Sequence, residues 1–164
     1  MGAYLDQPMT DKNPEHGSNE QCSWGVCSMQ GWRCGMEDDH IARQISIPGG
    51  KKAMLFCVFD GHGGKEVAKY AKERFTDIFL AQPEFKKSNF AAALTETFLM
   101  LDAEIKEKDY GMDTGATSCV VYMSDKEIVC ANAGDSRGVL YSGTKVVPLS
   151  DDHKPDNAGE LARI

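Results

Sequence analysis

Long apolar runs and clustered basic residues are both missing from this 164-residue chain. No stretch approaches the roughly 20 apolar residues of a membrane span, and the first residues lack the apolar run of a secretory signal peptide. The formal net charge is −7. We therefore expect no transmembrane segment and no nucleic-acid partner, because a phosphate backbone needs concentrated positive charge. Phosphorylated substrates stay compatible with this charge, since bound cations can reverse the sign of an acidic site.

The six cysteines contain no C-x-x-C pair, and the four histidines do not cluster with them. This spacing excludes the usual zinc sites. Without a signal peptide, we interpret the cysteines as free thiols in a reducing, intracellular compartment, and we expect a cytoplasmic or nuclear location. The cysteines are Cys22, Cys27, Cys34, Cys57, Cys119 and Cys130.

Composition changes after the first 21 residues. Residues 1–21 are polar and show no periodicity, which predicts a flexible N-terminal arm, and residues 22–164 form the folded part. Strands are predicted over 24–30 and 39–47. The run 53–59 is continuously apolar, as in a strand that is buried on both faces.

Two helices are predicted next, because apolar residues recur at helical spacing over 67–78 and 90–105. Two hairpins follow, over 117–133 and 137–149, and a further helix begins near residue 157. Short hairpin links favour antiparallel pairing. The order of elements therefore predicts an α+β fold in which antiparallel sheets carry helices on an outer face.

The segment Asp60-Gly61-His62-Gly63-Gly64 ends the apolar strand abruptly. An aspartate at the rim of a sheet is held rigidly, and the Gly61 carbonyl can serve a hard cation. The glycines permit positive φ and a close approach of the backbone to an ion or a phosphate. The alternative is a tight turn with an Asp cap and an incidental histidine.

Acidic residues also gather at Glu37-Asp38-Asp39, and such neighbours repel one another unless they are neutralised. Either the run is a solvated loop, or it binds a divalent metal. Asp135 again lies beside glycine where an apolar strand ends. Oxygen ligands of this kind select Mg²⁺ or Mn²⁺.

Such a site predicts metal-assisted hydrolysis, in which two cations share a carboxylate and activate a water to attack phosphorus. Arg33 is suited to bind two phosphate oxygens through its planar guanidinium group. His62 is suited to donate a proton to the leaving alkoxide. No G-x-S-x-G segment suggests a nucleophilic serine instead.

Several motifs in order resemble those of the protein phosphatase 2C family. They are Ser28–Arg33 with Met36–Asp38, Val58–Gly64, Thr114–Thr117, Asn132–Arg137 and Asp152–Pro155. The resemblance runs over nearly the whole chain. It implies a sandwich of two antiparallel β-sheets flanked by antiparallel helices, and phosphoserine and phosphothreonine in proteins as substrates.

The resemblance also implies two Mg²⁺ or Mn²⁺ ions and a third, weaker one. Oxygen ligands would come from Glu37, Asp38, the bridging Asp60, the Gly61 carbonyl and, for the third ion, Asp135. Arg33 would recruit the substrate phosphate, and His62 would be the general acid. The opening Met1-Gly2 is similar to members with an N-myristoyl group, which would add a weak membrane contact, although Asp6 stands where the acceptor pattern has Ser or Thr.

In this family the domain continues well past residues 152–155 and supplies two more metal-binding aspartates and several strands. We therefore expect a domain that is incomplete at its C-terminus and that needs a second chain to complete it. Two alternatives to the phosphatase remain: a non-catalytic module that binds phosphoproteins as a decoy, and a metal-dependent phosphoesterase for small molecules.

Overall fold

The computed structural model describes residues 4–111 and 113–163, in two compact units that comprise residues 1–37 and 38–164. The predicted myristoylation site at Gly2 lies outside the described residues. Within them, no helix combines the length and the apolar character that a membrane crossing requires.

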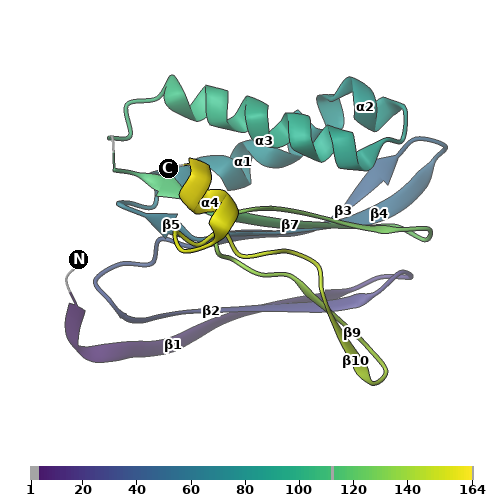
Figure 1. Cartoon of the computed structure of the whole chain (residues 1–164). Coiled ribbons are helices and arrows are strands. Elements are labelled where there is room, and N and C mark those ends of the chain that lie inside the picture. Colours follow the sequence, from purple (N-terminus) through teal and green to yellow (C-terminus); the bar gives the residue numbers. More distant parts are fainter. Residues whose placement is uncertain (1–3, 112, 164) are drawn as a thin grey trace. The chain divides into compact units, whose positions relative to one another are not determined.

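The first unit is an antiparallel hairpin of β1 (Tyr4–Ser18) and β2 (Ser23–Arg33) (Figure 1). Its turn is held by Asn19, whose backbone N–H donates to the Cys22 carbonyl at 2.9 Å. Residues 4–18 therefore form a strand, where the sequence predicted a flexible arm over residues 1–21. Ladder hydrogen bonds join backbone groups and need no apolar periodicity, so a polar segment pairs with β2 although its side chains give no strand signal.

The second unit contains a four-stranded antiparallel sheet in the order β3-β4-β7-β8. The strands are β3 (Asp39–Ile47), β4 (Lys51–Phe59), β7 (Ser118–Met123) and β8 (Ile128–Ala133). All four were predicted from the sequence within a few residues, and each of the two hairpin turns falls where expected. Ala53 and Met54 are both buried, as predicted for a strand covered on both faces, but Val58 is 50% exposed.

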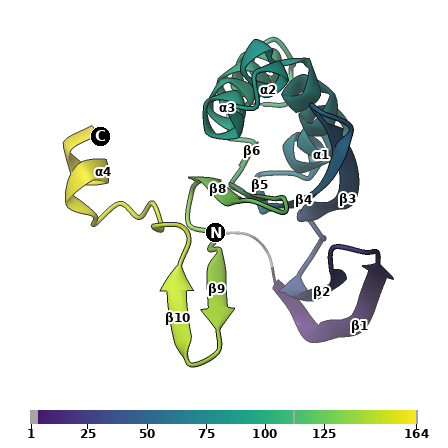
Figure 2. The ribbon, with the colours of Figure 1, turned by 90° about the vertical axis from the view of Figure 1, so that its right-hand side faces the viewer.

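Helices α1 (Glu66–Ala81), α2 (Pro83–Lys86) and α3 (Phe90–Lys106) gather over one face of this sheet (Figures 1 and 2). The helix α1 ends where Gln82 takes an extended conformation before Pro83, which in turn begins α2. The side chain of Asn89 caps α3 by accepting a hydrogen bond from the Ala92 N–H at 3.4 Å. Both long helices confirm the predicted apolar periodicity, whereas α2 was not predicted.

The core lies between these helices and the sheet, and aromatic rings dominate one part of it. Phe79 meets Phe85 at a centroid distance of 4.9 Å, Phe85 meets Phe90 at 5.4 Å, and Phe90 stacks on Tyr122 at 4.3 Å. Leu94 is fully buried in the same cluster. This continuous apolar contact holds the sheet and the helices as one body.

The remaining elements are short. They are β5 (Gly61–His62), β6 (Gly115–Ala116), β9 (Val139–Ser142), β10 (Lys145–Pro148) and α4 (Ala158–Arg163). β5 pairs with β6, and β9 pairs with β10, each antiparallel. The hairpin of β9 and β10 and the start of α4 confirm the sequence predictions, and the antiparallel sheets with their helices confirm the predicted α+β class.

Glu104 ties α3 to α1 through two partners. Arg74 donates to both oxygens of its carboxylate at 3.1 and 3.0 Å, and the Tyr70 hydroxyl donates at 2.8 Å. Arg74 first, and then Tyr70, lower the pKa of Glu104. A lowered folded-state pKa means that the stabilisation is present above the unfolded value of about 4.3 and is lost as the pH falls through the folded-state value.

We expect Glu104→Gln to lower the Tm at neutral pH by roughly 2–4 °C, because the charge-assisted, bidentate contact with Arg74 is lost. We also expect the variant to lose less stability than the wild type on acidification below about pH 4. Thermal melts from pH 7 to pH 3 measure both effects. Glu96→Gln, on the exposed side of α3, is the matched control; an equal Tm change in both variants would contradict the role of Glu104.

Candidate functional site

The β3–β4 ladder brings Asp38 and Asp60 to the same end of the sheet. In its register Asp39, the first residue of β3, lies opposite Phe59, the last residue of β4. Asp38 directly precedes the first of these residues, and Asp60 directly follows the second. Two carboxylates that lie 22 positions apart in the sequence are therefore neighbours at the ends of adjacent strands.

Asp135 reaches this end of the sheet from β8. Ser118 at the start of β7 pairs with Ala133 at the end of β8, and Val58 of β4 pairs with Cys119. The backbone N–H of Thr117 donates to the Asp60 carbonyl at 2.8 Å, and so joins the strand ends. The chain then continues from Ala133 through Gly134 to Asp135. Three predicted metal ligands thus leave strands at one end of the sheet.

His62 is fixed by the short β5–β6 pairing, in which it lies opposite Gly115. A Cβ atom on Gly115 would stand only 2.6 Å from the Nε2 atom of His62, so the imidazole rests against a bare backbone. Gly61 is buried and pairs with Ala116, while His62 itself is exposed. The sequence does not predict this pairing, because two residues per strand are too few to show a period.

Two glycines near the site adopt conformations that other residues rarely take. Gly63 has φ +69°, and a Cβ there would meet the Asp113 carbonyl oxygen at 2.1 Å. Gly134 has φ +107°, and its Cβ would lie 2.6 Å from that of Thr117. The predicted need for positive φ after Asp60 is confirmed at Gly63, where the close approach is to the chain's own backbone.

The charges at this end of the sheet are neutralised unevenly. The Asp39 carboxylate is engaged by the Lys72 ammonium at 2.5 Å, so the third acid of the run has a structural ion pair. Asp60 and Asp135 are exposed, and neither has an ion pair within residues 4–111 and 113–163. Nearby carboxylates without a cation partner have the all-oxygen donor chemistry that suits Mg²⁺ or Mn²⁺.

The described part of the chain contains no group of three His, Cys, Asp or Glu side chains already gathered closely enough to hold a metal ion. Arg33 and Glu37 belong to the first unit, at the end of β2 and just after it. The backbone carbonyl of Arg33 accepts a hydrogen bond from the Gln30 side chain at 2.8 Å. Their assignment to phosphate and metal therefore stays a prediction.

Thr117 and Asp152 belong to family-like motifs of the sequence, but neither was predicted to have a role at the site. The Thr117 hydroxyl lies 2.6 Å from that of Ser136, beside Asp135. Arg137 donates to both carboxylate oxygens of Asp152 at 2.7 and 2.6 Å and lowers the pKa of Asp152 to about 2. No local pattern marks either contact, since the partners lie 19 and 15 residues apart.

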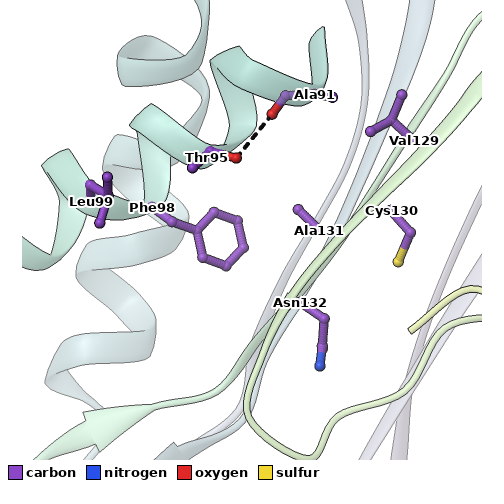
Figure 3. Close-up of a pocket in the computed structure, with 8 residues that line it drawn as sticks. All are labelled: Ala91, Thr95, Phe98, Leu99, Val129, Cys130, Ala131 and Asn132. Atoms are coloured by element: carbon purple, nitrogen blue, oxygen red, sulfur yellow. Dashed lines mark hydrogen bonds between the residues drawn. The ribbon is translucent and has the colours of Figure 1, made fainter. Parts of the chain in front are cut away.

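A separate cavity of about 360 Å³ lies between α3 and β8 (Figure 3). Its walls are mostly apolar, and none of the seven predicted site residues lines it. The lining residues are Ala91, Thr95, Phe98, Leu99, Val129, Cys130, Ala131 and Asn132. The cavity is therefore distinct from the acidic end of the sheet.

Residues 23–164 match the family model described as Protein phosphatase 2C. The chain belongs to the protein phosphatase 2C family. Protein phosphatase 2C homolog 3 of Schizosaccharomyces pombe is 43% identical over 168 residues, which cover all of this chain and 41% of that protein. Probable protein phosphatase 2C 6 of Paramecium tetraurelia is 38% identical over 178 residues, covering all of this chain and 59% of the relative.

A solved structure of serine-threonine phosphatase 2C from Toxoplasma gondii has the same fold, with a TM-score of 0.68. It is 18% identical and matches 98% of this chain and 57% of its own length. A second, a Caenorhabditis elegans sex determining protein, gives a TM-score of 0.65 at 21% identity, over 94% of this chain and 37% of its own. At these identities the likeness concerns the fold. The predicted family and fold are both confirmed, and this chain spans less than two thirds of either curated relative.

We expect Gly134→Ala to lower the free energy of unfolding by about 2–4 kcal/mol, because it combines backbone strain with a clash against Thr117. Gly49→Ala is the matched control. Gly49 also has positive φ, at +83°, but no atom lies within 4 Å of its Cβ position, so about 1 kcal/mol is expected. Urea unfolding measures both; equal losses would show that the contact with Thr117 is not a tight one.

Proposed function

We propose that this chain carries part of the active site of a Mg²⁺- or Mn²⁺-dependent phosphatase that hydrolyses phosphoserine and phosphothreonine in proteins. The observation that carries the proposal is the β3–β4 register, which sets Asp38 and Asp60 side by side in a member of the protein phosphatase 2C family. Cations bound there would neutralise the phosphate and supply an activated water as nucleophile.

In this proposal the ligands of the two main cations are oxygen atoms of Glu37, Asp38, Asp60 and the Gly61 carbonyl. The position of Asp60, at the end of a buried strand and with its carbonyl hydrogen-bonded to Thr117, supports a rigid bridging carboxylate. Asp135, two residues after the end of β8, would bind a third, weaker cation. The exposure of Asp60 and Asp135 leaves both carboxylates accessible to ions from solvent.

In this proposal, one side chain binds the substrate phosphate and another protonates the leaving group. Arg33 is exposed, and its guanidinium group can bind two oxygens of a phosphate. His62 would protonate the leaving serine or threonine oxygen, because imidazole is the side chain that most often serves as a general acid in enzymes. Its contact with Gly115 supports this role, since a ring held against the backbone needs little reorganisation before it donates a proton.

The activity belongs, in this proposal, to the complete catalytic domain. The chain spans 41% of the fission yeast relative and 59% of the Paramecium relative. Further carboxylates would then come from a longer chain or from a second one, in line with the sequence-based expectation.

We expect hydrolysis of a phosphothreonine peptide by the complete catalytic domain to require added Mn²⁺ or Mg²⁺ and to stop on chelation. Asp60→Asn should lower the rate by at least about a hundredfold, because it removes the bridging charge. Released phosphate measures the rate, and Mn²⁺ binding is followed in parallel by calorimetry.

Asp77→Asn, on the exposed face of α1, is the matched control and should leave both rate and binding unchanged. Turnover that survives a chelator would contradict the metal mechanism. Retention of phosphopeptide without phosphate release would instead support the non-catalytic binding module considered from the sequence.

A further inference from the structure

The segment Leu149–His153, named here the clasp, runs alongside Gly134–Gly138, the turn that carries Asp135. At one end of the contact, the Leu149 N–H donates to the Gly138 carbonyl at 2.9 Å, and the Gly138 N–H donates to the Ser150 hydroxyl at 3.0 Å. At the other end, Asn132 donates through its side-chain amide to the Asp151 carbonyl at 3.1 Å. These bonds hold the clasp against the turn along its whole length.

His153 forms two hydrogen bonds with Gly134. Its backbone N–H donates to the Gly134 carbonyl at 2.9 Å, and its Nδ1 atom accepts from the Gly134 N–H at 3.3 Å. The Asn132 amide also donates to that carbonyl, at 3.0 Å. Both backbone groups of the residue before Asp135 are therefore engaged, which leaves the Gly134 peptide little freedom to rotate.

A charge pair at Asp152, next to His153, anchors the clasp. Asp152 accepts two hydrogen bonds from Arg137, and the Lys154 ammonium lies 3.2 Å from the same carboxylate. The Asp152 side chain is only 12% exposed. The two hydrogen bonds fix the geometry of the pair, although the Arg137 side chain is 59% exposed, so the clasp is joined to the turn on the far side of Asp135.

Thr117 also contacts the turn, at Gly134 and Ser136. The Cβ position of Gly134 lies 2.6 Å from that of Thr117, and the Thr117 hydroxyl contacts the Ser136 hydroxyl. Thr117 also binds the Asp60 carbonyl through its N–H. The turn is thus held between Thr117, which connects it to Asp60, and His153, which belongs to the clasp.

We propose that His153 is a positioning residue for Asp135: its imidazole locks the Gly134 peptide so that the Asp135 carboxylate is preorganised to bind a divalent cation. The inference rests on the proposed function. Outer groups that orient a ligand contribute substantially to metal affinity, although they never touch the ion. A role in stability alone would leave the affinity at Asp135 unchanged in the folded protein.

The test is a titration of the ¹⁵N-labelled chain with Mg²⁺, followed by the chemical-shift changes of the Asp135 and Asp60 amide signals. In His153→Ala, half of the chemical-shift change at Asp135 should need about tenfold more Mg²⁺ than in the wild type. The Asp60 signal should respond as before and so serves as the internal reference. Circular dichroism confirms that the variant is folded.

His153→Asn is the rescue variant, because its Oδ1 atom lies where the imidazole has Nδ1 and can accept from the Gly134 N–H. It should restore the Asp135 response to within about twofold of the wild type. His16→Ala, an exposed histidine of β1, controls for the loss of an imidazole elsewhere. An unchanged Asp135 response in His153→Ala overturns the proposal, and so does an equal shift at Asp60 and Asp135.

Failure of cation binding at this end of the sheet, on which the proposed function depends, would look different: neither signal of the wild type would shift with Mg²⁺. Amide hydrogen exchange of Gly134 then tests the lock on its peptide without any metal. Faster exchange in His153→Ala, but not in His153→Asn, supports the lock, whereas equal exchange in all three proteins overturns it.

Discussion

The pairing of Asp39 with Phe59 in the β3–β4 ladder is the constraint on which the candidate site depends. Side chains alternate between the two faces of a sheet, so a slip of one residue would turn the core residues Ile41 and Cys57 outward. Because those residues are buried against the helices, the slip is strongly disfavoured. The same apolar contacts that stabilise the sheet therefore also keep Asp38 beside Asp60.

The interactions that fix the polar end of the sheet differ from the apolar contacts of the core. Its geometry comes from backbone hydrogen bonds and from glycines that allow close contact, as at Gly134 against Thr117 and at Gly115 beneath His62. Lys72 neutralises Asp39, and Asp60 and Asp135 stay exposed. A rigid apolar body with exposed acids at one end is a suitable scaffold for cation chemistry, because the ligands are preorganised before the ion arrives.

Sequence periodicity predicted the elements whose apolar side chains pack in the core. The strands β3, β4, β7 and β8 and the helices α1 and α3 all carry apolar residues at the spacing that their burial requires. It failed for β1, which is polar and pairs through its backbone, and for β5 and β6, which are two residues long. The helix α2 was not predicted either, because four residues are also too few to show a period.

The sequence by itself determined the residue types of the site and the positions where strands end, because a carboxylate beside glycine after an apolar run is a local pattern. Its motifs also determined the family. Only the tertiary structure decided that Asp38, Asp60 and Asp135 leave the same end of one sheet, since strand order and register arise from contacts between distant residues. The clasp on Gly134 is likewise tertiary: its partners lie 19 residues apart, and nothing local connects them.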